Sequence, residues 1–284
     1  MKGILIVGAT GAVGSRSLAR AKSEGHWVRV LVRKESADRL AVSADDVVIG
    51  DATDSATLKG ICDGIDAVLS TFGASVDLAA KETRRFRQVD TAGNANLIRE
   101  AKDAQVPRFV YVGVHSGPGY AHTQYMRAHQ DVVDLLASSG LSNTVVRPTG
   151  IFSAFAVMVD MARKGQLGMI GGGMARTNPI SPGDVAELCI DHLFDGPKEI
   201  SAGGPDILTR REIAELACEA AGKPPKAMSA PPAVAKAIGK IIGVFNSRRG
   251  ELIEFLTAVA TSDSVGPKVG KERLVDFFAT LKSN

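Results

Sequence analysis

The sequence predicts an α/β fold: a doubly wound parallel sheet with helices on both faces, followed by a smaller C-terminal region. Short apolar runs alternate with longer segments of mixed polarity from residue 3 to about residue 148. Glycine and polar residues separate one run from the next. This alternation is typical of βαβ units, whose strands lie parallel. Because crossovers between parallel strands are right-handed, the helices are expected to cover both faces of one sheet.

The expected strands before residue 150 are short, largely apolar runs. Parallel strands that are buried on both faces have this composition. They cover residues 3–7, 27–32, 47–50, 67–73, 108–114 and 143–148. Helices are expected between them, over residues 11–25, 55–62, about 78–104 and about 123–139.

The pattern changes after residue 150. A helix is expected over residues 181–194, with Ser181 or Asp184 near its start, and another over 208–223. In the second helix Thr209 is the expected N-cap, and Glu212 stands three residues later, as in a capping box. A proline-rich linker, residues 223–232, leads to an amphipathic helix over 233–245. That helix could lie on a membrane surface, but we expect it to cover a substrate pocket or a subunit face.

Composition sets limits on the class of protein. The chain has 284 residues, 45% of them hydrophobic, and a net charge of +3 with interspersed charges. This is enough apolar sequence for a sizeable core and predicts no nucleic-acid partner. The three cysteines are far apart, which indicates a reducing compartment. We find no signal peptide and no apolar run of membrane-spanning length, so we expect a cytoplasmic protein without stable membrane insertion.

A glycine-rich turn follows the first expected strand and opens the first helix. It reads Gly-Ala-Thr-Gly-Ala-Val-Gly over residues 8–14. In this context Gly8 permits a tight turn, Gly11 lets the backbone approach a pyrophosphate at the positive helix end, and Gly14 allows close helix–strand packing. The turn therefore predicts a dinucleotide site in a Rossmann-type sheet.

The ends of the next strands indicate which dinucleotide binds. Arg33 and Lys34 follow the second strand, where an acidic residue would select NAD and a basic residue accommodates the 2′-phosphate of NADP. We therefore expect NADP (NADPH). Ligands of such sheets bind at the carboxyl ends of the strands. Asp51 with Ala52, and Phe72 with Gly73, follow the third and fourth strands, so they are expected near the adenine and the adjacent ribose.

Several segments together resemble one family. "GATGAVG", "VRVLVRK", "GDATD", "STFG", "RFVYVGV" and "VVRPTGIF" are similar to the motifs of atypical short-chain dehydrogenase/reductases, the NmrA-like branch. The resemblance implies hydride transfer to or from a small organic substrate, although the branch also contains cofactor sensors without activity. By match, the pyrophosphate would contact Gly8, Thr10, Gly11, Ala12, Val13 and Gly14. Pro148, Thr149 and Phe152 would lie beside the nicotinamide.

The resemblance also implies a division of the chain. Residues 1–150 would form the NAD(P)-binding Rossmann domain, and residues 151–284 a mixed region that completes the sheet and forms the substrate lid. We expect an apolar roof from residues 151–178 and 225–260. Its candidate side chains, which could equally be plain core, are Phe155, Met158, Met161, Met169 and Met174. The partner would be a small molecule, and the protein a monomer or a homodimer.

The candidate catalytic residues are Tyr125, His129 and Ser116. The family's motif is Tyr-x-x-x-Lys, in which a cation lowers the pKa of the tyrosine that donates a proton. Here Tyr125 matches and His129 replaces the lysine. The two share a helix face at i, i+4, but a histidine is only about a quarter charged at pH 7. Ser116 is the family's serine candidate, with His115 competing for its role. The alternative to a catalytic role is a structural one, in which a partly buried Tyr125 anchors the helix and His129 lies on the surface.

Three functions remain open from the sequence. The first is an NADP-dependent reductase of a small, mostly apolar carbonyl, enone or quinone. The second is an NADP(H)-sensing or accessory protein without catalysis, which the missing lysine favours. The third, weaker alternative is a sugar-nucleotide epimerase. A hydrolase elbow and the usual metal-binding spacings are absent from the sequence, so we expect no metal.

Overall fold

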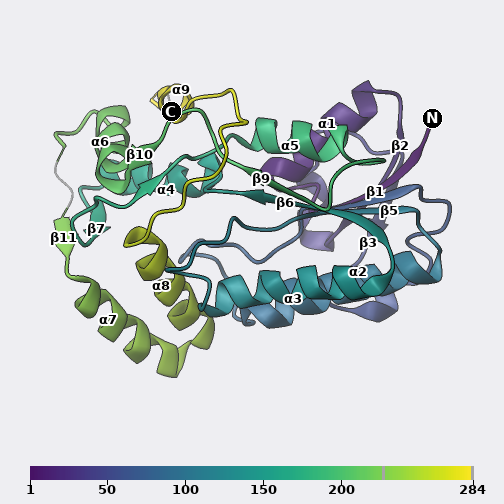
Figure 1. Cartoon of the computed structure of the whole chain (residues 1–284), viewed down its shortest axis with the longest axis horizontal. Coiled ribbons are helices and arrows are strands. Elements are labelled where there is room, and N and C mark those ends of the chain that lie inside the picture. The colour runs from purple at the N-terminus through teal and green to yellow at the C-terminus, as the bar shows by residue number, and fades with distance from the viewer. Residues whose placement is uncertain (226–227, 283–284) are drawn as a thin grey trace.

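The computed structural model describes residues 1–225 and 228–282. Its centre is a seven-stranded sheet with the order β3-β2-β1-β4-β5-β6-β9, in which every neighbouring pair is parallel (Figure 1). The strands are β1 (Gly3–Val7), β2 (Trp27–Val32), β3 (Asp46–Ile49), β4 (Ala67–Ser70), β5 (Arg108–Val112), β6 (Ser142–Pro148) and β9 (Glu199–Ala202). The order reverses between β1 and β4, which confirms the doubly wound α/β prediction.

Helices cover both faces of the sheet. On one face α1 (Ala12–Ser23) packs beside α5 (Pro182–Asp191), and on the other α2 (Ala92–Asp103) packs beside α3 (Gln124–Ser139) (Figure 1). Each layer has its own buried cluster against the sheet. The three cysteines are free, and all are buried. Ser181 caps α5 by accepting a hydrogen bond from the Asp184 backbone N–H.

The C-terminal region forms a separate hydrophobic core at the end of the sheet. Here α4 (Phe152–Arg163), α6 (Arg210–Ala220) and α9 (Leu274–Thr280) enclose a separate cluster. Thr209 and Glu212 form the predicted capping box of α6. Short strands accompany these helices: β7 (Gly168–Ile170) with β11 (Met228–Ala230), and β8 (Arg176–Thr177) with β10 (Leu208–Thr209). The last part is a hairpin of α7 (Pro232–Phe245) and α8 (Ser247–Ala260).

Two expected helices are wrong in extent. The segment expected as a helix over 78–104 is helical only from Arg87, first as a π-helical turn, η3 (Arg87–Thr91), and then as α2. Before it, the side chains of Asp77 and Glu82 accept hydrogen bonds from the backbone N–H groups of Ala79 and Arg84. Such local bonds compete with helix formation.

The second is the helix expected over 55–62. It is only a 3-10 turn, η2 (Ser55–Leu58). Another 3-10 turn, η1 (Lys34–Arg39), follows β2. Part of the expected linker over 223–232 is strand β11, and its residues 226–227 lie outside the described residues. Residues 283–284 of the C-terminal region also lie outside them. Within the described ranges, no helix combines the length and apolar character needed to cross a bilayer.

Candidate active site

A crevice of about 890 Å³ lies over the carboxyl ends of β1, β2, β3 and β4. This is the edge at which doubly wound sheets bind dinucleotides. Most of the predicted cofactor residues line it: Gly8, Thr10, Gly11, Arg33, Asp51, Ala52, Phe72 and Gly73. Ala12, Val13 and Gly14 follow directly in the first turn of α1. Lys34, in contrast, is exposed and does not line the crevice.

The glycines of the turn are required by close contacts. Gly8 has a φ of +90°, and a Cβ there would lie 2.6 Å from Thr71 Oγ1. A Cβ on Gly14 would lie 2.2 Å from the carbonyl oxygen of Gly8, so α1 can approach β1 only without a side chain. Gly11 is the N-cap of α1 and supplies no side-chain cap. The first N–H groups of the helix therefore remain available to an anion such as a pyrophosphate.

Two polar side chains next to Arg33 were missed from the sequence. Ser36 and Arg39 belong to η1 and line the same end of the crevice, where Arg39 Nη2 donates to Ser36 Oγ at 2.6 Å. Glu35 is also there, with an oxygen 3.4 Å from Arg33 Nε. The 3-10 turn brings the i and i+3 side chains together. This end of the crevice thus combines two guanidinium groups with one carboxylate.

Asp51, after β3, is held in place by hydrogen bonds. Its Oδ1 accepts hydrogen bonds from the backbone N–H and the hydroxyl of Thr53, at 2.9 and 2.8 Å. Arg84, which sequence reasoning also missed, lies 3.7 Å from Asp51 Oδ2 and donates to Thr53 Oγ1. Arg84 comes from the segment that was wrongly expected to be helical. Its position in the crevice wall therefore had no signal in the sequence pattern.

Tyr125 and His129 lie together on the inner side of α3. Their ring centroids are 4.7 Å apart, as the i, i+4 spacing predicts. Tyr125 is half-buried, and its ring also packs against Phe86 and Phe255. No hydrogen bond holds its hydroxyl within the described part of the chain. His129 is buried, so the interpretation that placed it on the surface is wrong.

Both nitrogens of His129 face polar groups other than Tyr125. Nδ1 is 2.5 Å from the hydroxyl of Tyr111 on β5, and Nε2 is 3.7 Å from Oδ1 of Asp90. Asp90 belongs to the π-helical turn η3, a type of distortion that is frequent at functional sites. The same carboxyl oxygen accepts a hydrogen bond from the Ala74 N–H in the wall of the crevice. Asp90 thus connects the crevice wall to the candidate catalytic helix.

Burial sets the protonation of this cluster. It lowers the pKa of His129 to about 4, and the nearby Arg147 adds to this effect, so the imidazole is neutral at pH 7. Burial also raises the pKa of Asp90 to about 7. It raises the pKa of Tyr125 above its usual value, and the charge of Asp90 acts in the same direction. The tyrosine is therefore a neutral hydroxyl, and its neighbouring histidine is not a cation.

The other candidate catalytic residues, which follow β5, are less well placed to act on a substrate. Ser116 is exposed, and no side-chain hydrogen bond holds it in the described structure. Tyr120 is buried, and its hydroxyl contacts Ser264 Oγ at 2.9 Å and the carbonyl oxygen of His115 at 3.1 Å. Burial lowers the pKa of His115, so its imidazole is neutral at pH 7. Within the described residues, no cluster of His, Cys, Asp and Glu side chains could hold a metal ion.

Three residues expected beside the nicotinamide do not line the crevice. Pro148 and Thr149 are buried at the end of β6, where Thr149 Oγ1 donates to the carbonyl oxygen of Asn178. Phe152 has no exposed surface and packs against Phe277 in the C-terminal cluster. Of the three, Phe152 belongs to the C-terminal cluster.

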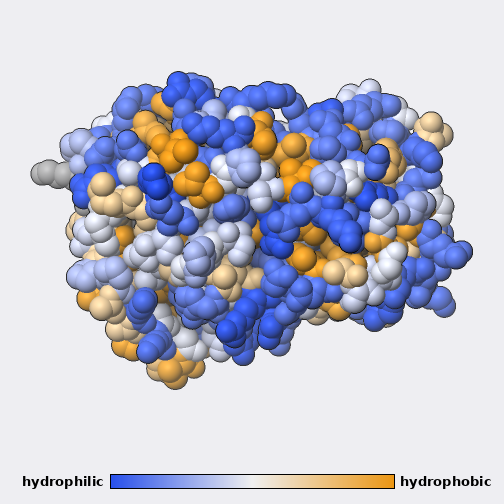
Figure 2. Space-filling view, viewed as in Figure 1, coloured by the Kyte–Doolittle hydropathy of each residue, from blue (hydrophilic) through white to orange (hydrophobic). Residues whose placement is uncertain are grey.

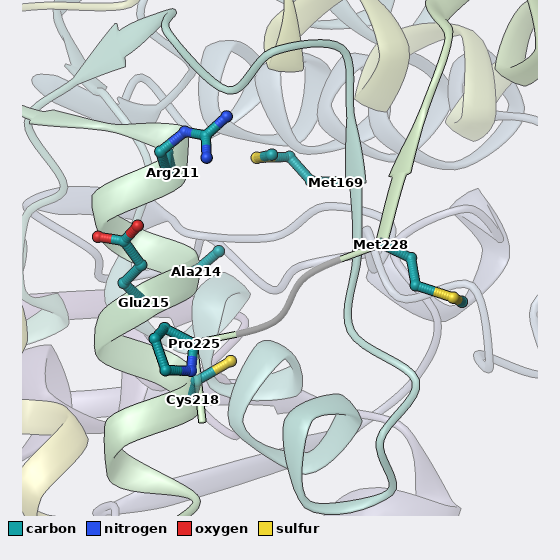
Figure 3. Close-up of a pocket in the computed structure, with 7 residues that line it drawn as sticks. All are labelled: Met169, Arg211, Ala214, Glu215, Cys218, Pro225 and Met228. Carbon is teal, nitrogen blue, oxygen red and sulfur yellow. The ribbon is translucent and has the colours of Figure 1, made fainter. Parts of the chain in front are cut away.

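The side chains expected as an apolar roof lie away from the crevice. Phe155, Met158 and Met161 pack against the C-terminal cluster, as plain core would, and Met174 is exposed. Met169 lines a separate cavity of about 350 Å³ with Met228 on one side and α6 residues, among them Arg211, on the other (Figure 3). None of these side chains lines the crevice.

Arg248, near the start of α8, is a further buried residue that the sequence did not single out. Its side chain is fully buried, with the guanidinium 5.4 Å from the centre of the Phe86 ring. One nitrogen donates to the carbonyl oxygen of Ser75, a residue that lines the crevice. Its charge also opposes the effect of burial on the pKa of Asp90. The C-terminal hairpin is thereby attached to the crevice wall.

Comparison with known proteins agrees with this geometry. Residues 8–196 match a protein family described as NAD(P)H-binding. Over 148 residues the chain is 30% identical to the photosystem II assembly factor Ycf39 of Synechocystis sp., covering 52% of this chain and 44% of that protein. It is 27% identical over 233 residues to the sanguinarine reductase of Eschscholzia californica, covering 67% of this chain and 83% of that protein.

Among solved structures, the fold is similar to an NADPH-dependent quinone oxidoreductase of Escherichia coli complexed with NADPH. The TM-score is 0.72 at 17% identity, and the match covers 98% of this chain and 99% of that one. At this identity the likeness concerns the fold. The chain spans only about half the length of several curated relatives, between 44% and 61%.

Proposed function

Because the chain belongs to the NAD(P)H-binding family of atypical short-chain dehydrogenase/reductases, we propose that it is an NADPH-dependent reductase. Its substrate is a small, mostly apolar carbonyl, enone or quinone. The observation that carries the proposal is the position of Tyr125. A neutral hydroxyl stands on α3, next to a residue network that reaches the cofactor crevice through Asp90 and Ala74.

The crevice fits the pyrophosphate and the 2′-phosphate of NADP. Gly8 and Gly14 leave the space that a Cβ would fill, and the start of α1 offers N–H groups to the pyrophosphate. Arg33, Ser36 and Arg39 supply charged and hydroxyl donors for the 2′-phosphate. When bound, the cofactor supplies the hydride. Glu35 at the same end would oppose the phosphate, so the preference for NADP depends on the two arginines.

The protein supplies the proton. Tyr125 is protonated at neutral pH, and burial raises its pKa further above the usual value, so it acts as a general acid toward a substrate oxygen. His129 contributes no charge, since its imidazole is neutral. It fixes the helix face through Tyr111 and orients the ring of Tyr125. Tyr125 therefore donates its proton without a lysine to stabilise the tyrosinate that forms, and we expect turnover to be slow.

The surroundings of Tyr125 favour an apolar substrate. Phe86, Tyr120, Leu252 and Phe255 form a buried cluster against which Tyr125 packs. Aromatic and aliphatic side chains of this kind suit a planar ring and offer little to a polyol. The name of one relative, a sanguinarine reductase, supports an aromatic substrate class.

The test is a panel of quinones, enones and aldehydes with the purified protein, followed by the loss of NADPH absorbance. We expect turnover with at least one quinone or enone, and a higher kcat/KM with NADPH than with NADH. Binding of NADPH should be measured in parallel by titration. Tight NADPH binding without turnover on any member of the panel would overturn the proposal.

That outcome would support the second candidate, an NADP(H)-sensing protein. The specific observation in its favour is that both nitrogens of His129 face away from Tyr125, toward Tyr111 and Asp90. The epimerase alternative has less support. A sugar nucleotide needs several hydrogen-bonding side chains, whereas the cluster around Tyr125 is aromatic and aliphatic.

A further inference from the structure

Helix α7 carries a row of exposed apolar side chains. The row consists of Val234, Ile238, Ile241, Val244 and Phe245, and we call it the α7 face. Its members are between 47% and 88% exposed, with the highest value at Phe245. Figure 2 shows apolar surface at the lower left edge, where Figure 1 places α7. Apolar patches of this kind on a folded protein are unusual and mark interaction surfaces.

The opposite side of α7 is fixed against α8. A Cβ on Gly239 would lie 2.8 Å from Ile253 Cγ2, and one on Gly250 would lie 2.5 Å from the Cα of Gly243. The two helices therefore approach closely through small residues. Ala235, on the same side of α7, is buried. The apolar row cannot turn inward without breaking this packing, so its exposure is a property of the fold.

The charged residues of α7 itself have one sign. The helix contains Lys236 and Lys240, both exposed, and no acidic residue. At 100° per residue both lysines fall on one flank of the apolar row. Arg249, also exposed, follows the tip formed by Val244 and Phe245. An apolar stripe bordered by cations matches an interface between lipid tails and anionic headgroups.

We propose that the α7 face docks this protein on the surface of an anionic lipid bilayer. The axis of α7 lies along the membrane plane, Phe245 and Val244 enter the acyl boundary, and the lysines and Arg249 meet headgroup phosphates. A helix of 14 residues is about 21 Å long, which is too short to span the bilayer. The attachment is therefore peripheral, and it does not require that the protein be a reductase.

A second copy of the chain fits this surface less well. In a symmetric dimer built on α7, the same patch faces itself across the two-fold axis. Such an interface would bring the lysines of both copies close to it, and α7 has no carboxylate to balance them. Like charges that meet in a buried interface are unfavourable. An anionic membrane supplies the missing negative charge.

The experiment is sedimentation of the full chain with vesicles of phosphatidylcholine alone and of phosphatidylcholine with phosphatidylglycerol. We expect at least tenfold stronger binding to the anionic vesicles, weakened by salt. The double variant Ile241→Asn, Phe245→Ser should lose at least tenfold of that binding. Lys236→Gln with Lys240→Gln should lose most of its dependence on the anionic lipid. Ile207→Ser, which changes an exposed apolar residue outside α7, is the matched control and should bind as wild type does.

These variants change exposed side chains, and circular dichroism verifies that they fold. If the wild-type chain stays in solution with anionic vesicles, the proposal is wrong. If sedimentation equilibrium instead gives a dimer that the Ile241→Asn, Phe245→Ser variant converts to a monomer, the α7 face is a subunit interface. Equal binding of the wild type and this variant would also overturn it, because the lipid contact would then lie elsewhere.

Discussion

The ring of Tyr125 lies edge-on to the ring of His129, one turn further along α3, at a centroid distance of 4.7 Å and an angle of 75°. The imidazole directs its nitrogens toward Tyr111 and Asp90, so it offers Tyr125 packing without a charge. In the resembled motif a lysine supplies that charge. The spacing of the motif is thus retained while its electrostatics are changed, and the hydroxyl must act as an acid with a raised pKa.

Replacement of Tyr125 by Phe tests this role directly. The ring contacts with Phe86 and Phe255 remain, and only the hydroxyl is lost. We expect kcat/KM for the best substrate of the panel to fall about 100- to 10,000-fold, the usual contribution of general acid catalysis. The affinity for NADPH, measured by titration, should not change. An unchanged kcat/KM would remove Tyr125 from the mechanism.

The buried pair of Asp90 and His129 predicts a specific pH dependence of stability. The folded pKa of Asp90, about 7, lies above its unfolded value, so its bound proton stabilises the fold increasingly as pH falls from 7 to 4. The folded pKa of His129, about 4, lies below its unfolded value, so this group destabilises the fold as pH falls from 6.5 to 4. The two groups therefore change the free energy of unfolding in opposite directions as pH falls.

Asp90→Asn removes the contribution of Asp90 to the pH dependence of stability. The asparagine oxygen can still accept the Ala74 N–H, but the titration is gone. The free energy of unfolding of the variant, from urea denaturation, should therefore fall relative to wild type as pH is lowered from 7 to 4. His129→Gln should give the opposite trend in the same range. Parallel curves for wild type and Asp90→Asn would show that the pKa of Asp90 is the same in the folded and the unfolded chain.

The preference for NADP is expected to depend on Arg33 and Arg39. Replacing either by Ala should weaken NADPH binding about 10- to 100-fold, since a hydrogen bond to a charged group contributes about 1.5–3 kcal/mol. Binding of NADH should change little, because it lacks the 2′-phosphate. Lys34→Ala is the matched control: it removes a neighbouring exposed cation that does not line the crevice. Equal losses for NADH and NADPH would mean that these arginines act on another part of the cofactor.

Gly14→Ala tests the contact between α1 and the phosphate turn. The new Cβ would lie 2.2 Å from the carbonyl oxygen of Gly8, a backbone atom that no side-chain rotation can move away. We expect a loss of about 1–3 kcal/mol in the free energy of unfolding, as for other overpacked sites, together with weaker NADPH binding. Gly172→Ala is the control, since the nearest atom to its Cβ is 3.9 Å away. A Gly14→Ala variant as stable as wild type would show that α1 can shift at little cost.

The strands were predictable because each is a short apolar run between polar turns, and buried parallel strands have no other signature. Every strand expected before residue 150 is present, and β1 and β2 have the predicted bounds. The helix expected from residue 78 failed because Asp77 and Glu82 bond to nearby backbone groups, a local choice that hydrophobic periodicity does not report. Part of the crevice wall, residues 80–84, comes from that irregular segment.

The candidate site was predictable where it depends on a local motif. The glycine turn and Arg33 follow directly from strand ends, whereas Ser36 and Arg39 require knowledge of the 3-10 turn that pairs them. Asp90 and Arg248 carried no signal, because their significance comes from burial beside residues distant in sequence. The absence of charge on His129 likewise follows from its surroundings, which residue type alone does not reveal.

Arg248 gives the hairpin of α7 and α8 a second attachment. At the turn between the two helices, Phe245 is exposed to solvent. Arg248, three residues later, donates a hydrogen bond to the carbonyl oxygen of Ser75 in the crevice wall. The same short segment thus lies between the exposed tip of the hairpin and the crevice wall. Equilibrium coupling between two binding sites acts equally in both directions. If the crevice and the α7 face are coupled through this segment, a cofactor in the crevice and a membrane at the α7 face would change each other's affinity by the same factor.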